Sequence, residues 1–198
     1  YRKMILGDEL TPVGKLSSAF MSPPTPMHLQ FAYYESALVI EFLVEKYGMR
    51  SLRAILADLG EGREINDAIS RHAAPIGKFE EQFAAYARKR AEALAPAVDW
   101  EEPSRDMIDP ADPQAVQFWL ASHPNSYWAL NLQALGFIAE QKWQEAKTPL
   151  EKLISLYPQN AGEGNAYVLL AGVHRRLNET EQERQILTKL AALSADAA

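Results

Sequence analysis

Apolar residues recur at spacings of three and four along most of this chain, which is the period of an amphipathic helix. The longest run predicts a helix that starts at Leu29 and ends at Gly48, a residue suited to a left-handed stop. The residues on its predicted inward stripe are Leu29, Tyr33, Ser36, Ile40, Leu43, Val44 and Tyr47. No stretch alternates with period two, so we expect no strand. The pattern indicates an all-α fold.

Shorter apolar runs predict further helices in the first half. One covers residues 52–59 and ends at Gly60, a short one is capped by Asn66, and a third carries Phe79 and Phe83. Before residue 28 the chain is rich in turn residues. There Thr11-Pro12 predicts a cap and first helical position for a short helix through Leu16 and Phe20, and the prolines at 23, 24 and 26 predict an extended segment.

A boundary between two domains is expected where helical periodicity stops. Residues 96–113 hold four prolines and six acidic residues against one arginine, a composition typical of a linker or a surface connector. We therefore predict a helical domain at residues 1–98, a connector at 99–112 and a second helical domain at 113–198. Trp100 is expected to anchor the connector back onto the first domain.

The second half is predicted to contain helical hairpins. Asp112 and Pro113 are a cap and first position for a helix that ends near Pro124. With Ala146 at the crossing of two helices, the apolar and terminating positions of a 34-residue hairpin are Leu130, Phe137, Leu150, Leu153 and Pro158. A second copy matches at Tyr167, Leu170, Ala171, Leu187 and Leu190. This spacing resembles the tetratricopeptide repeat, although Glu183 occupies the small position of the second copy, where it is expected to widen the helix crossing.

Charge and composition narrow the classes of function. The net charge is -6, and basic residues are interspersed with acids, which argues against a nucleic-acid partner. No run of about 20 apolar residues is present, so no membrane-spanning segment is expected. The chain has no cysteine, and this agrees with either a reducing or an oxidising compartment. Because it begins at Tyr1, we interpret it as a segment of a longer protein, and its localisation is not assigned.

Sites of familiar chemistry are not evident in the sequence. Two histidines that share zinc on one helix face stand three or four residues apart, whereas the four histidines here, at 28, 72, 123 and 174, are far apart. No nucleophile elbow or phosphate-binding glycine loop occurs. Adjacent acids such as Glu80 and Glu81 diverge on a helix and do not form a dyad. We therefore expect no cofactor and no enzymatic activity in this segment.

The run Phe31-Ala32-Tyr33-Tyr34-Glu35-Ser36 nevertheless resembles a family motif. It is similar to the tyrosine-bearing helix of peptidase-MA-like, gluzincin-type zinc metallopeptidases, and the resemblance extends over residues 1–95. In that family the tyrosine can stabilise an oxyanion, which implies a catalytic role for Tyr33, with Tyr34 as the second choice. The family's zinc-binding His-Glu-x-x-His helix has no counterpart here. A core role for Tyr33 is the alternative, because tyrosines on apolar stripes are usually packed inside.

The repeats suggest protein binding. Stacked hairpins present a concave face made by the first helix of each. In this register that face carries Trp128, Asn131, Leu135, Ile138, Val168, Arg175 and Arg176. An extended peptide could lie there, with the arginines bound to a carboxylate; intramolecular bracing of a neighbouring domain is the alternative.

Two hypotheses follow. In the first, the chain is a non-catalytic helical segment of a larger zinc-metallopeptidase-like protein, with tetratricopeptide-like repeats for protein interaction or bracing. In the second, it contributes Tyr33 to a zinc-dependent peptidase site that upstream residues complete, with zinc held in the parent protein. A His-Glu-x-x-His sequence upstream would favour the second.

Overall fold

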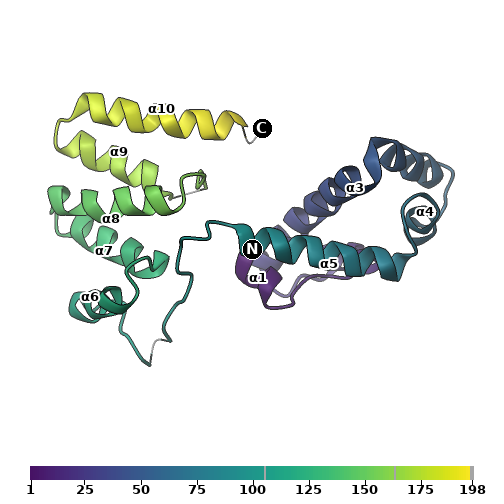
Figure 1. Cartoon of the computed structure of the whole chain (residues 1–198), viewed down its shortest axis with the longest axis horizontal. Coiled ribbons are helices and arrows are strands. Elements are labelled where there is room, and N and C mark those ends of the chain that lie inside the picture. Colours follow the sequence, from purple (N-terminus) through teal and green to yellow (C-terminus); the bar gives the residue numbers. More distant parts are fainter. Residues whose placement is uncertain (105, 163, 197–198) are drawn as a thin grey trace. The chain divides into compact units, whose positions relative to one another are not determined.

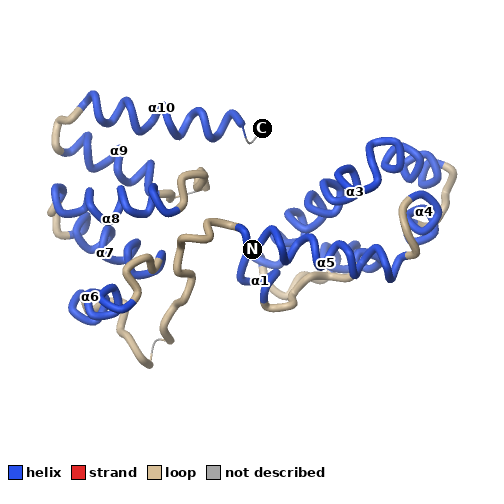
Figure 2. Tube along the Cα trace, in the orientation of Figure 1, coloured by secondary structure: helices blue, strands red, loops and turns tan. Residues whose placement is uncertain are grey.

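The computed structural model describes residues 1–104, 106–162 and 164–196. Within them the chain forms ten α-helices and one 3₁₀-helix and no strand, which confirms the predicted all-α fold (Figures 1 and 2). Asp99 and Ser126 make one isolated parallel bridge. The chain divides into two compact units, Tyr1–Leu94 and Ala95–Ala198. Each unit is described by itself.

The first unit is built around one long, interrupted helix. Its elements are α1 (Arg2–Leu6), η1 (Val13–Lys15), α2 (Leu16–Met21), α3 (Pro26–Gly60), α4 (Ile65–His72) and α5 (Ile76–Ala93). Thr25 caps α3, since its side chain accepts a hydrogen bond from the His28 backbone N–H, and Pro26 takes the first helical position. At Gly48 the backbone leaves helical geometry, with φ 84° and ψ 159°, and the helix then resumes. The predicted stop is therefore a kink between two helical halves.

The core of the first unit lies between α3 and α5. Phe42 of α3 is 3% exposed, and its ring centroid lies 5.2 Å from that of Phe79 and 5.9 Å from that of Phe83, both on α5. Ala68 and Ile69 of α4 belong to the same buried cluster. Aromatic rings at these separations add to the stabilisation from burial itself. The apolar residues of α3 and α5 thus explain why these helices pack together.

The second unit is a stack of helices in chain order. Its elements are α6 (Pro113–Ser122), α7 (Tyr127–Ala139), α8 (Trp143–Leu156), α9 (Ala166–Arg176) and α10 (Thr180–Asp196), and each packs against the next (Figure 1). Asp112 caps α6 by accepting the Gln114 N–H, as predicted. Ser126 and Asn165 cap α7 and α9 in the same way. These caps satisfy backbone donors that a helix start leaves unpaired.

The two hairpins are packed at most of the positions where the sequence predicts small or apolar residues, although the predicted position Leu187 on α10 is 39% exposed. Ala146 and Leu150 of α8 are fully buried, and Leu170 of α9 is 1% exposed. Glu183, at the position that corresponds to Ala146, accepts a hydrogen bond from Arg175 Nε at 2.8 Å. The second hairpin therefore has an ion pair between its helices where the first has direct packing.

Trp100 packs against aromatic residues of the second unit, and two other local predictions are wrong. The Trp100 ring stacks on Tyr127 at 5.3 Å and lies edge-on to Tyr157 at 6.0 Å. The Asp99 N–H donates to the Asn125 carbonyl and the Asp99 carbonyl accepts the Tyr127 N–H, and these two bonds hold this part of the connector there. Asn66 lies inside α4 instead of capping it, and the turn-rich start contains a helix, α1, that the pattern did not predict.

Candidate functional site

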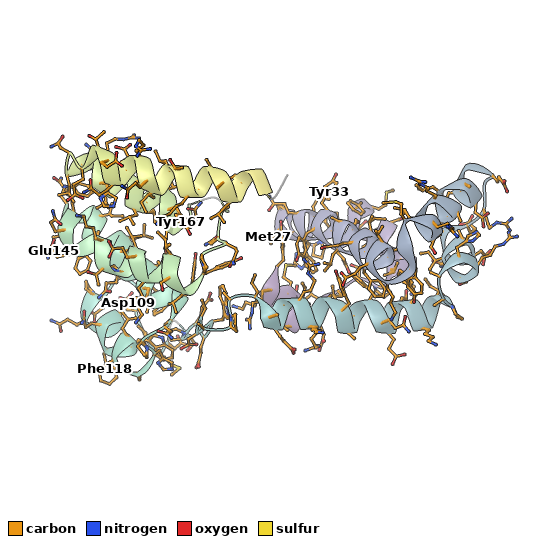
Figure 3. All side chains as sticks on the ribbon, turned by 45° about the horizontal axis from the view of Figure 1, so that its top comes forward. Met27, Tyr33, Asp109, Phe118, Glu145 and Tyr167 are labelled. Atoms are coloured by element: carbon orange, nitrogen blue, oxygen red, sulfur yellow. The ribbon has the colours of Figure 1, made fainter. Side chains whose placement is uncertain are left out.

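Tyr33, the predicted oxyanion-stabilising residue, lies on the surface of α3. Its side chain is 64% exposed and stands out from the helix (Figure 3), and Ile40 on the same stripe is 47% exposed. The prediction that both face inward is therefore wrong. Of the predicted stripe, Leu43 is buried, and the other buried residues in this part of α3 are Phe31, Ala32, Glu35, Leu38, Val39 and Phe42. The glutamate among them concealed the buried face from a search for apolar periodicity.

Both tyrosines contact other aromatic residues. The Tyr33 ring meets the ring of Phe20 edge-on at 5.0 Å, and Phe20 lines an apolar groove of about 280 Å³ between α2, α3 and α4. Tyr34 is 39% exposed, and its ring stacks on that of Tyr1 at 4.7 Å. Tyr33 is thus the more open of the two hydroxyl-bearing side chains.

Glu35 is the most unusual ionisable group in the first unit. Its side chain is fully buried, and one oxygen, Oε1, accepts the Thr11 backbone N–H at 2.7 Å. The other oxygen, Oε2, is buried with no hydrogen-bond partner among the described residues. Burial raises the pKa of the Glu35 carboxyl to about 7, although the bond from Thr11 acts in the opposite direction. The carboxyl therefore titrates near neutral pH while holding the loop before η1.

The four histidines lie apart, each with local partners. His72 Nε2 lies 2.9 Å from Asp58 Oδ2, and His174 Nδ1 lies 2.6 Å from Glu179 Oε2. His28 pairs with Glu9, and the His123 ring stacks on Trp119. In the described part of the chain, no three His, Cys, Asp or Glu side chains converge as a metal site would require. The histidines are explained by these local contacts.

The predicted peptide-binding residues divide into exposed and engaged groups. Leu135 and Val168 are 41% and 47% exposed, whereas Trp128, Asn131 and Ile138 are half-buried. Both predicted arginines already have partners. Arg175 is bonded to Glu183, and the Arg176 guanidinium lies over the Trp143 ring, 5.8 Å from its centroid.

Leu135 borders an open groove of about 410 Å³ between α6 and α7. One wall consists of residues 110–111 with Pro113, Val116 and Gln117. The other wall is lined by Glu140, which follows α7, and by the α7 residues Leu132, Gln133, Leu135, Gly136, Phe137 and Ala139. This volume falls within the range of about 300–1,000 Å³ that is usual for binding pockets.

The surface around this groove is unusual in its lack of charge. Residues 113–139, which include all of α6 and α7, contain no Asp, Glu, Lys or Arg. Phe118 on α6 is 79% exposed and projects from the helix (Figure 3). The signal was present in the sequence as a 27-residue stretch without these four residue types. Sequence reasoning weighed net charge and repeat spacing, and so it missed the local depletion.

Two glutamines and a glycine shape the groove. Gln133 Nε2 donates to Gln117 Oε1 at 3.3 Å, so the amides join α6 to α7. Gly136 is exposed, and a Cβ atom there would meet no other atom within 4 Å. The groove is therefore open above Gly136, bordered by apolar side chains and a pair of amides.

Comparison with known proteins identified no relative of this chain. No family model matches the chain, and neither the curated proteins nor the solved structures contain a match. Within the described residues, no helix has the length and apolar character needed to cross a membrane.

Proposed function

We propose that this chain is a protein-binding segment of a larger zinc-metallopeptidase-like protein, and that its own role is interaction and not hydrolysis. The observation that carries the proposal is the groove between α6 and α7, which is apolar, open and placed in an uncharged surface. The cores of protein interfaces are depleted of charged residues and enriched in aromatic ones. Phe118 and Leu135, exposed on neighbouring helices, fit that composition.

The helical stack supports the same role. Ala146, Leu150 and Leu153 are buried within the α7–α8–α9 core, so the groove stands on a packed support. Ser126 and Asp112 fix the starts of α7 and α6. A surface held in this way loses little conformational entropy on binding, which favours affinity.

The test is selection of a displayed random-peptide library on the intact 198-residue chain. Selected peptides should bind the unaltered chain and fail to bind Gly136→Leu, whose side chain would fill the groove. Gly172→Leu is the matched control, because Gly172 is likewise an exposed helical glycine with open space at its Cβ position, on α9. Absence of any selected peptide, or equal binding to both variants, would contradict the proposal.

A second candidate function is completion of a zinc-peptidase site, which the exposure of Tyr33 favours. Its hydroxyl is open to a further segment, and the neighbouring Phe20 lines an apolar groove. A phenol that donates to a developing oxyanion is worth about 3–4 kcal/mol of transition-state stabilisation. The zinc and the residues that hold it would come from the parent protein.

Turnover by the full-length parent distinguishes this second function. Tyr33→Phe should lower kcat by about 100-fold or more, as loss of an oxyanion donor does. Because Tyr33 is mostly exposed, the thermal stability should hardly change. Unaltered turnover in Tyr33→Phe would rule out the catalytic role.

A further inference from the structure

We propose that the groove between α6 and α7 binds a peptide segment with one apolar anchor side chain followed by lysine or arginine residues, and binds it in one orientation. This inference rests on the protein-binding function proposed above and adds the chemistry of the partner. The apolar walls would hold the anchor, and the acidic end of the groove would hold the basic residues.

The acidic end follows from how α6 and α7 lie together. The start of α6 and the end of α7 line the same groove, since Pro113 and Glu140 are both among its lining residues. Asp109 and Asp112 immediately precede α6 and flank the lining residues Pro110 and Ala111. Glu140 lines this end of the groove, and Asp109 and Asp112 are next to its lining residues in the sequence, whereas α6 and α7 themselves contain no Asp, Glu, Lys or Arg.

The two aspartates are held in place by the backbone. Asp109 Oδ1 accepts the Ala111 N–H and Asp112 Oδ1 accepts the Gln114 N–H, each at 2.9 Å. Glu140 differs, because Lys142 Nζ lies 2.6 Å from its Oε2 and offsets its charge. We therefore expect the negative charge at this end to come mainly from Asp109 and Asp112, for which no ion pair is found among the described residues. Complementary charges across an interface give specificity and faster association.

The charge of the whole unit argues against a second copy of this chain as the occupant. Residues 95–198 contain 14 Asp and Glu against 8 Lys and Arg. Two such units placed face to face would bring like charges together, which opposes association. A basic segment carries the opposite charge and would be attracted to this unit.

The anchor would lie over Gly136, and the amide pair would bind the peptide backbone. Gly136 offers open space, and Leu135 and Val116 offer apolar contact on the two sides. The bond from Gln133 to Gln117 uses one donor and one acceptor of the pair. The Gln117 amide nitrogen and the Gln133 carbonyl oxygen can then bond to an extended chain, as side-chain amides do.

Fluorescence anisotropy with defined peptides tests this chemistry. The probe is a fluorescein-labelled 12-residue peptide with one phenylalanine followed by three lysines; the comparison peptides carry three glutamates, three glutamines, or the lysines before the phenylalanine. We expect the first peptide to bind about 10-fold tighter than the glutamate peptide, and tighter than the reversed one. Its affinity should also fall as salt is raised.

The double variant Asp109→Asn/Asp112→Asn isolates the charge. Asparagine caps helices about as well as aspartate, so α6 should remain folded. Affinity for the lysine peptide should fall about 3- to 10-fold while affinity for the glutamine peptide stays the same. Equal binding of lysine and glutamate peptides would overturn the inference and leave the protein-binding function standing. If none of the defined peptides binds, the inference fails, and the library selection still decides the protein-binding function. If sedimentation shows a dimer that Gly136→Leu dissociates, a second copy occupies the groove and the inference fails as well.

Discussion

Replacing Glu35 by glutamine tests the energetic consequence of its burial. The pKa of the Glu35 carboxyl is raised from 4.5 to about 7. This shift corresponds to a free-energy cost of about 3 kcal/mol for ionising the group in the folded state, since one pKa unit is worth about 1.4 kcal/mol. Because the side chain is fully buried, solvent screening does not reduce this figure much. Glutamine keeps an oxygen that can accept the Thr11 N–H and never ionises. It should therefore remove the cost of burying a carboxylate.

The direction of the pH dependence follows from proton linkage. Between pH 4.5 and about 7 the folded state holds a proton on Glu35 that the unfolded state releases. The stabilising contribution of this group is complete below pH 4.5 and is lost as the pH rises through 7. The wild-type chain and Glu35→Gln should thus be about equally stable at pH 4.5, whereas the variant should be more stable by up to about 3 kcal/mol at pH 8.

The assay must report on the first unit alone. Urea-dependent hydrogen exchange of α3 and α5 amides, measured by mass spectrometry from pH 4.5 to 8.5, provides this. All four tryptophans lie in the second unit, so tryptophan fluorescence supplies an internal control that should not change. Taking the difference between the two proteins cancels the titration of other groups. A difference that does not grow with pH, or a variant less stable at pH 8, would refute the reasoning.

Two further changes test the fold. Gly48→Ala should destabilise the first unit by about 1–3 kcal/mol in urea titrations followed by hydrogen exchange, because φ 84° with ψ 159° is accessible almost only to glycine. Gly60→Ala is the control, since Gly60 has ordinary helical geometry. Equal stability of the two variants would contradict the predicted backbone strain. Ala146→Leu should cost the second unit about 1–3 kcal/mol by tryptophan fluorescence, since a larger side chain overpacks a fully buried site. An unchanged midpoint of urea unfolding would contradict this, because it would show that α7 and α8 can move apart to accommodate the larger side chain.

Several features of the fold could be predicted because local chemistry determines them. Gly48, Asp112 with Pro113, and Ala146 each have a conformational or steric requirement that the sequence states directly. Which face of α3 is buried could not be predicted in this way, because the buried face contains Glu35 and the exposed face contains Tyr33 and Ile40. Periodicity predicts that a helix has an apolar side. It does not identify which residues form that side when a polar residue is buried and apolar residues are exposed.

The candidate site depended on tertiary contacts that periodicity does not report. The second hairpin pairs Arg175 with Glu183, so an arginine expected to meet a ligand already has an acidic partner. Trp100 finds Tyr127 and Tyr157, two aromatic residues that are distant in sequence. The groove required α6 and α7 to be placed side by side. Only then did the uncharged stretch become a surface with one acidic end.

The most direct test of the protein-binding account is to map a selected peptide onto the ¹⁵N-labelled chain by NMR. The account predicts that amide shifts change along α6, α7 and the 109–112 turn, and that Gly136→Leu abolishes them while Gly172→Leu does not. Shifts confined to α9 and α10, or to the first unit, would contradict the claim that the groove between α6 and α7 is the binding site.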